Sequence, residues 1–327
     1  MWRFFHSSLH RRRWLQWGAV SAGAWILAGC TQPVNPLRVG SLSFPGYEPL
    51  FVAREQGWLN PDQVRLVEMH SNADTLRALT SGRLEAGQMT LDEFLTLRAG
   101  GQDVRILAVL DISEGADVIM ARPGLKLPVT PQRLRIAMEE GTVGAIVLAR
   151  FLAQQGLAPS DVRKTSVPFG SHVAAYRQGM HDLIVTAEPW ATEIEASGGT
   201  RIFDSRAIPG LIVDVLAART DTLTPFGPGY EHLVESHFRA LRWMAVNPQE
   251  AARIMAPRLQ VPEADVPATF RGLRQPDAAT SRELLQAGSE LEGNLFRLAR
   301  MMRDQQLMPD VELRGPFFEP RFHPPVR

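Results

Sequence analysis

The sequence predicts an α/β protein built from two successive α/β units and a helical C-terminal region. The first observation is Leu37–Leu59, whose pattern predicts a buried strand, a turn at Phe44–Gly46 and a helix ending near Gly57. The second is that the same order of strand, loop and helix returns after the proline-rich segment Pro123–Pro131. The third is that only helical patterns follow Thr224. Two α/β units of this kind predict two lobes, with a small-ligand cleft between them.

Composition limits the kinds of partner. The chain has 327 residues, and its 35 Lys and Arg balance its 35 Asp and Glu, so no global charge favours nucleic acid or an acidic membrane. Cys30 is the only cysteine, which excludes an intrachain disulfide and a Cys-based metal site.

The N-terminus predicts export and a lipid anchor. Arg11–Arg13 precede the apolar stretch Trp14–Ala28, which is too short to span a membrane as a mature helix. The stretch ends in Leu27-Ala28-Gly29-Cys30, which resembles a bacterial lipobox with Cys30 as the lipidated first mature residue. We therefore expect a signal peptide over 1–29 and a tether over 30–36. The alternative is a buried cysteine after an uncleaved anchor, and the three arginines leave both general and twin-arginine export open.

After Leu59 the sequence pattern predicts alternating strands and helices for the rest of the first α/β unit. Asn72 is a plausible N-cap, and Thr90 with Glu93 matches a capping box. The expected strands are Val64–Met69, Leu84–Met89, Val104–Leu110 and Val118–Ala121, and the expected helices run from Asn72 to about Gly82 and over Leu91–Arg98.

The same patterns predict the strands and helices of the second unit and of the C-terminal region. Pro189 suits the first position of a helix. The expected strands are Leu134–Met138, Val162–Val167, Leu183–Thr186 and Val213–Ala218, and the expected helices are Ala145–Gln155, His172–Arg177, Tyr230–Val246, Pro248–Leu259, Pro262–Arg271 and Ser281–Gln305.

Several segments resemble a known family in the same order along the mature chain. The sequence is similar to the substrate-binding proteins of ABC importers, in the branch that contains nitrate, sulfonate, taurine and pyrimidine-precursor binders. The matching segments are Gly46-Tyr47-Glu48-Pro49-Leu50, Ala53-Arg54-Glu55-Gln56-Gly57, Thr90-Leu91-Asp92-Glu93, Leu110 to Asp117, Glu188-Pro189-Trp190, Phe203-Asp204-Ser205, Ile208-Pro209-Gly210 and Val213-Asp214-Val215.

The resemblance implies the two-lobed type II periplasmic binding protein fold. It places lobe 1 at 37–121 and 217–327 and lobe 2 at 122–216. It implies a monomeric, lipid-anchored receptor on the periplasmic side of a bacterial membrane, which closes on a small organic solute and delivers it to a permease. The permease and the ATPase would be separate chains. The sequence departs from the family at Gly179–Asp182.

Helix starts and loops expected at the cleft supply the candidate ligand contacts. We expect Glu48 and Glu188 to be the main ones, with Thr142 contributing from lobe 2 as the resemblance implies. Acidic residues but no lysine lie at these loops, which favours a neutral or cationic solute such as an amine or an aminopyrimidine-like ring. Each acid could instead cap its own helix. The full set is Phe44, Tyr47, Glu48, Thr90, Asp92, Asp111, Ser113, Thr142, Glu188, Trp190 and Asp214.

Catalysis is not expected. The sequence has no nucleophile beside a base in a recognisable motif, no paired-histidine metal spacing and no phosphate-binding loop, so no catalytic residue, metal or cofactor is predicted. Two alternatives stay open: a sensor or interaction lipoprotein without a transport role, and an enzyme on the same fold. Pyrimidine synthases that resemble this family carry a cysteine-rich motif, which this chain lacks.

Overall fold

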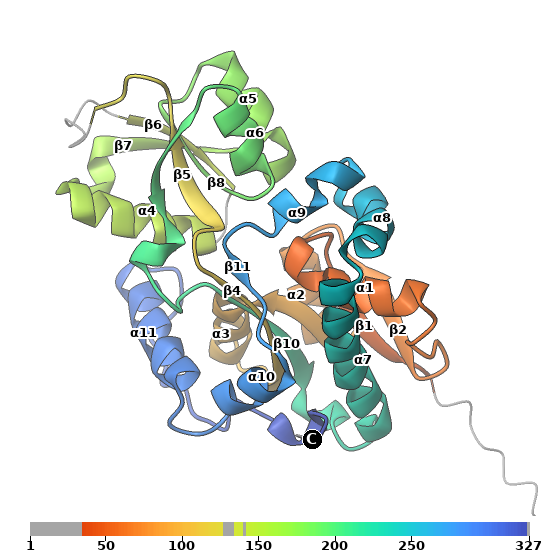
Figure 1. The fold of residues 1–327 in the computed structure, drawn as a ribbon. Coiled ribbons are helices and arrows are strands. Elements are labelled where there is room, and N and C mark those ends of the chain that lie inside the picture. The colour runs from red at the N-terminus through yellow and green to blue at the C-terminus, as the bar shows by residue number, and fades with distance from the viewer. Residues whose placement is uncertain (1–34, 127–133, 140–141, 326–327) are drawn as a thin grey trace, which may run out of the picture. The chain divides into compact units, whose positions relative to one another are not determined.

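The computed structural model describes residues 35–126, 134–139 and 142–325, so Cys30 lies outside the described residues. Residues 36–327 form one compact unit, which contains two β-sheets (Figure 1). In this part of the chain no helix is long and apolar enough to cross a membrane.

The first sheet contains six strands in the order β11-β4-β10-β3-β1-β2. β1 lies parallel to β2 and β3, whereas β10 lies antiparallel to β3 and β4. The strands are β1 (Leu37–Ser41), β2 (Val64–Glu68), β3 (Ala86–Thr90), β4 (Val104–Ser113), β10 (Val213–Arg219) and β11 (Leu273–Arg274), and their helices are α1 (Glu48–Glu55), α2 (Asn72–Thr80) and α3 (Leu91–Ala99).

The second sheet contains five strands in the order β7-β6-β8-β5-β9. β6 lies parallel to β7 and β8, and β5 runs antiparallel to β8 and β9. The strands are β5 (Asp117–Ala121), β6 (Leu134–Met138), β7 (Val162–Ser166), β8 (Leu183–Ala187) and β9 (Thr200–Asp204), and the helices are α4 (Thr142–Gln155), α5 (His172–Gln178) and α6 (Trp190–Ala196).

The chain passes between the sheets twice, and both crossings differ from the predicted lobe boundaries. Residues 117–121, expected in lobe 1, form β5 of the second sheet, whereas 213–216, expected in lobe 2, begin β10 of the first. The crossings therefore lie between β4 and β5 and between β9 and β10. Sequence pattern alone does not locate the first crossing, because apolar buried strands lie on both sides of it.

The helices after β10 are more broken than predicted. The expected helix Ser281–Gln305 is two helices, because Gly288 has a φ of 77° and Ser289 caps a new helix by accepting a hydrogen bond from the Glu292 N–H. Ser71, rather than Asn72, caps α2, and Pro189 is the N-cap of α6. The elements are α7 (Gly227–Val246), α8 (Pro248–Leu259), α9 (Val266–Thr269), α10 (Ala278–Leu284) and α11 (Glu290–Asp304).

Three apolar clusters cover the faces of the sheets. Helices α1, α7 and α8 pack on one face of the first sheet, and α5 and α6 pack on one face of the second. The largest cluster includes α2, α3 and α11 on the other face of the first sheet and continues through α4 to the second sheet. The two sheets are therefore joined by shared apolar packing as well as by the two crossings.

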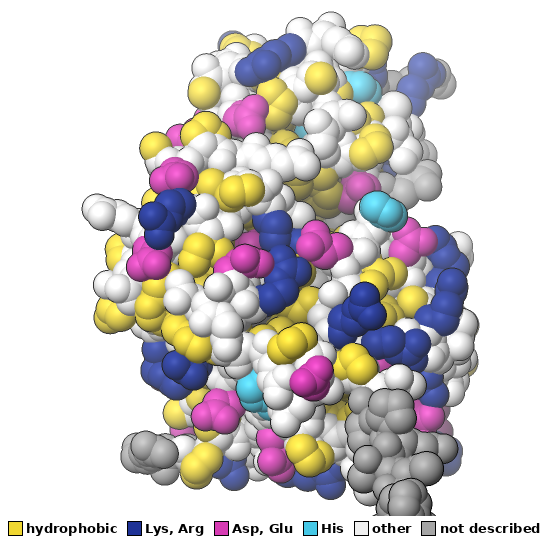
Figure 2. Space-filling view, turned by 90° about the vertical axis from the view of Figure 1, so that its right-hand side faces the viewer, with side chains coloured by type: hydrophobic (Ala, Val, Ile, Leu, Met, Phe, Trp, Pro, Cys, Tyr) yellow, Lys and Arg dark blue, Asp and Glu magenta, His cyan; other side chains and the backbone are white. Residues whose placement is uncertain are grey.

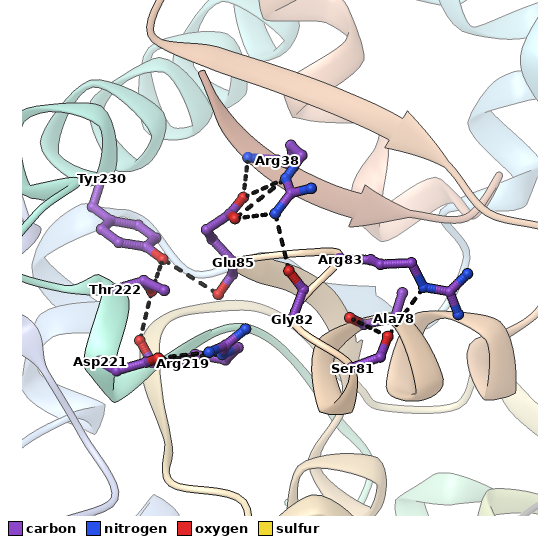
Figure 3. Close-up of polar contacts among 10 residues, drawn as sticks. All are labelled: Arg38, Ala78, Ser81, Gly82, Arg83, Glu85, Arg219, Asp221, Thr222 and Tyr230. Atoms are coloured by element: carbon purple, nitrogen blue, oxygen red, sulfur yellow. Dashed lines mark hydrogen bonds and ion pairs between the residues drawn. The ribbon is translucent and has the colours of Figure 1, made fainter. Parts of the chain in front are cut away.

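A buried carboxylate beside β1 is fully paired. The Glu85 side chain lies along the guanidinium of Arg38, and Arg38 Nε donates to Glu85 Oε2 at 3.0 Å (Figure 3). The backbone carbonyl of Glu85 accepts from the Tyr230 hydroxyl at 3.3 Å. Thr222 lies 2.6 Å from the same hydroxyl. Charge and hydrogen-bonding capacity are thus matched at this end of the first sheet.

The surface carries mixed charge. On the face shown in Figure 2, basic and acidic side chains lie interspersed rather than gathered by sign. This distribution agrees with the balanced composition.

Candidate functional site

Glu48, at the start of α1, is buried against an arginine. Its Oε1 accepts a hydrogen bond from Arg258 Nε at 2.9 Å, and its Oε2 has no protein partner. Arg258 also donates to Glu68 at 2.6 Å and lies 3.3 Å from the centre of the Phe51 ring. Burial raises the pKa of Glu48 to about 7, although Arg258 lowers it.

Glu188 is also buried against an arginine. Its Oε1 accepts from Arg201 at 2.8 Å, and its Oε2 accepts from the Thr192 N–H at 3.1 Å and from the Thr192 hydroxyl at 2.8 Å. Arg201 lies on β9 and also donates to the Gly115 carbonyl at 2.9 Å. Both expected main ligand contacts therefore already have protein partners. The sequence reasoning missed the two arginines, since Arg258 lies 210 residues from Glu48.

Asp111 and Asp214 form a different arrangement. They are register partners on β4 and β10, and 2% and 5% of their surfaces are exposed. Asp111 Oδ2 and Asp214 Oδ1 have no hydrogen-bond partner among the described residues. Burial raises the pKa of Asp111 to about 7, and burial followed by the charge of Asp111 raises the pKa of Asp214 well above its usual range.

Residues of the turn before α1 lie against this carboxyl pair. A Cβ on Gly46 would stand 1.7 Å from Asp111 Oδ2, so only glycine allows the carboxylate to lie there. Tyr47 is buried, and its burial, followed by the charge of the neighbouring Asp214, raises the pKa of its hydroxyl. The Gln88 amide donates to the Tyr47 carbonyl at 3.4 Å, while its fully buried Oε1 has no partner.

Further acids approach the pair from α3 and β5. Half of the predicted capping box forms: the Thr90 N–H donates to Glu93 Oε2 at 3.0 Å and α3 begins at the next residue, whereas the Thr90 hydroxyl has no partner among the described residues. Burial followed by the charge of buried Asp92 raises the pKa of Glu93. Asp117 is partly buried, and its pKa is raised as well.

Ser113 lies at the first crossing rather than in an open site. Its hydroxyl lies 2.8 Å from the Ser205 hydroxyl and accepts from the Asp117 N–H at 3.2 Å. Ser205 accepts from the Gly115 N–H at 2.7 Å. These bonds tie the two crossings together.

The predicted aromatic residues lie in two places. Phe44 packs edge-on against Tyr47 with the ring centres 5.2 Å apart. Trp190, the first residue of α6, stacks on Phe169 at 5.0 Å and 18°. Phe169 was not predicted, since it lies on a separate turn 21 residues earlier than Trp190 in the sequence. Thr142 begins α4.

The largest described groove is lined by none of the predicted ligand contacts. No group of three or more His, Cys, Asp or Glu able to hold a metal ion occurs among residues 35–126, 134–139 and 142–325. A groove of about 1030 Å³ lies between α7, α8, α9 and α10, lined by side chains such as Phe238, Met255 and Phe270.

Comparisons with known proteins extend these observations. The model of the NMT1-like family matches residues 31–260, and no curated protein matches the sequence. The structure is similar to the ligand-binding component of an ABC-type import system from Staphylococcus aureus, solved with zinc bound (TM-score 0.71, 16% identity, covering 88% of this chain and 97% of that one). It is also similar to the periplasmic aliphatic sulphonate binding protein SsuA from Escherichia coli (TM-score 0.72, 17% identity, covering 84% of this chain and 94% of that one). A third similar structure is the periplasmic nitrate-binding protein NrtA from Synechocystis (TM-score 0.61, 17% identity, covering 85% of this chain and 91% of that one).

Proposed function

Because the chain belongs to the NMT1-like family, as the predicted resemblance implied, we propose that it is the substrate-binding component of an ABC importer. It binds a small organic solute and delivers it to a membrane permease. The fold is that of periplasmic binding proteins, and the double crossing between two sheets is the observation that carries the proposal. No catalytic step is required.

We assign the lobes by sheet membership. Lobe 1 comprises 37–113 and 213–327, and lobe 2 comprises 117–204, with the two crossings as the hinge. Solute contacts to both lobes would favour the closed arrangement. Export to the periplasm and attachment through lipid on Cys30 are part of this proposal.

We infer that the solute is cationic or neutral rather than anionic. Asp111 and Asp214 are buried, and within residues 35–126, 134–139 and 142–325 no arginine or lysine is among the charges that shift their pKa values. An anion beside them would add a like charge to a desolvated group, whereas an amino group would remove the imbalance. The arginines beside Glu48 and Glu188 are occupied by those carboxylates.

A thermal-shift panel tests the proposal. The mature protein is heated with primary amines, aminopyrimidines, nitrate and alkanesulfonates. A solute at a hundred times its Kd adds about 2.7 kcal/mol to the free energy of unfolding. Stabilisation by amines or aminopyrimidines is expected. Stabilisation by nitrate or sulfonates alone would contradict the inferred charge, and no response to any small solute would contradict solute binding.

The lipid anchor is tested separately by a Cys30→Ser variant in a bacterial host. The variant should lose incorporation of labelled palmitate and leave the membrane fraction, whereas its thermal-shift responses should be unchanged. Palmitate incorporation by the variant would contradict lipidation at Cys30.

A further inference from the structure

Each of the two crossings between the sheets is in contact with a segment that follows β10 in the chain. The first crossing is 114–116, between β4 and β5, and the second is 205–212, between β9 and β10. The segment 271–274 ends in β11, which pairs with the end of β4 beside the first crossing (Figure 1). Helix α11 lies against the second crossing.

The segment 271–274 meets the first crossing backbone to backbone. The Glu114 N–H donates to the Gly272 carbonyl at 2.7 Å, and Arg274 Nε donates to Glu114 Oε1 at 2.5 Å. Gly272 has a φ of 74°, and a Cβ on it would stand 2.5 Å from the carbonyl carbon of Gly115 and from the nitrogen of Ala116. Only glycine permits this approach, so the two backbones are in direct contact.

The same segment also reaches the second sheet's helix α6. Arg271 donates to Glu195 Oε2 at 3.2 Å, and Arg201 of β9 donates to Glu195 Oε1 at 3.1 Å. Arg201 in turn donates to Glu188 and to the Gly115 carbonyl of the first crossing. A continuous set of charge-assisted hydrogen bonds therefore joins lobe 1, lobe 2 and the first crossing.

The second crossing is held from lobe 1 in a similar way. Gly210 has a φ of 69°, and a Cβ on it would overlap Nδ2 of the buried Asn294 on α11. Arg297, one turn later on α11, donates to the Pro209 carbonyl at 3.4 Å and is also hydrogen-bonded to Asn294. Both crossings are thus in close contact with lobe 1 through a glycine.

We propose that the segment 271–274 and α11 form a hinge bracket that restrains rotation of one lobe relative to the other, an inference that rests on the lobe assignment of the proposed function and on no particular solute. The Arg271–Glu195 ion pair joins the lobes directly, so rotation stretches or breaks it. Its side chains are 53% and 34% exposed, and exposed ion pairs contribute little free energy. Solute contacts to both lobes can therefore overcome the restraint.

Distances between spin labels on the two lobes test the bracket without any solute. The variant Cys30→Ser removes the only cysteine, so labels can be attached at cysteines introduced by Arg65→Cys on β2 and Arg163→Cys on β7. Both positions are exposed and lie on strands. Pulsed electron spin resonance then gives the distribution of label-to-label distances, and we expect a single narrow distribution when the bracket is intact.

Two variants in the labelled protein remove one contact each. Arg271→Gln removes the charge that reaches Glu195, and Asn294→Ala removes the side chain beside the second crossing. Each should broaden or displace the distribution. The matched control is Arg253→Gln, which breaks an exposed ion pair with Glu250 inside α8 and should leave the distribution unchanged. Salt at about 1 M, where charges are screened beyond about 3 Å, should broaden the distribution of the intact protein more than that of Arg271→Gln.

The outcomes separate the hinge bracket from the proposed function. Distributions equal to that of the intact protein in both Arg271→Gln and Asn294→Ala would overturn the bracket, and so would a broad distribution before any contact is removed. Broadening of the same size in Arg253→Gln would overturn it as well. Solute responses in the thermal-shift panel are independent of these distances, so a failure of the bracket leaves the transport role standing.

Discussion

Two kinds of buried acid lie at strand ends and helix starts of this protein. Glu48 and Glu188 each accept hydrogen bonds from an arginine at 2.9 and 2.8 Å. Asp111 and Asp214 face each other with no such partner. All four acids lie at similar positions in the α/β pattern. What distinguishes the two kinds is whether an arginine is bonded to the carboxylate. We therefore propose that the paired acids are structural, because removing either partner would leave a buried charge, and that the unpaired acids are the better candidates for solute recognition.

The largest expected effect tests the arginine-paired group. Arg258→Ala would leave Glu48 fully buried without its charge partner, and such a loss destabilises proteins by about 3–5 kcal/mol. The measurement is urea unfolding at pH 8. The matched control is Arg253→Ala on the same helix, because its contact with Glu250 joins two exposed side chains and should contribute less than about 1 kcal/mol. Equal effects would show that Glu48 needs no partner.

Glu188→Gln tests whether the second paired acid is structural. The neutral amide weakens the bonds from Arg201 and Thr192, and hydrogen bonds to a charged group contribute about 1.5–3 kcal/mol. We expect a loss of stability of that size, with solute affinity changed less than threefold, as about 0.6 kcal/mol would give. Unchanged stability with weaker binding would restore Glu188 as a ligand contact.

Gly46→Ala tests the contact between the turn and the unpaired acids. The added methyl would overlap Asp111 Oδ2, and overpacking of this kind costs about 1–3 kcal/mol. Gly227→Ala is the control, because a Cβ there meets no atom within 4 Å. A stability equal to that of the control would mean that the carboxylate moves away without cost.

The last prediction concerns the dependence of stability on pH. The pKa of Asp111 is raised to about 7 in the folded protein, so its contribution is most favourable below its unfolded pKa of about 4 and is lost as pH rises from there to about 7. Asp111→Asn should therefore gain roughly 1.4 kcal/mol of stability relative to the wild type per pH unit between pH 5 and pH 7, and little more above pH 7. A constant difference between pH 5 and pH 8 would indicate that the carboxyl group does not titrate in this range.

Local sequence signals predicted most helices and strands. The features that were missed depend on contacts between distant segments of the chain. Leu134–Met138 and Pro248–Leu259 have the predicted bounds, because apolar period and flanking prolines are local features. The break at Gly288 was missed, because the apolar stripe continues past it. The acids at the candidate site were identified individually, but their division into two kinds depends on Arg258, Arg201 and the β4–β10 register, which no local pattern contains.

The bond between Ser113 and Ser205 has a mechanical consequence. It joins the two crossings at one point, so any rotation of one sheet relative to the other turns both crossings about a common pivot. The displacement of an atom in such a rotation grows with its distance from the pivot, and Asp111 lies only two residues before Ser113. In such a rotation Asp111 would move little, whereas Trp190 at the start of α6 would travel further. If the lobes close on a solute as proposed, groups beside the crossings would contact it before closure, and groups such as Trp190 only as the lobes meet.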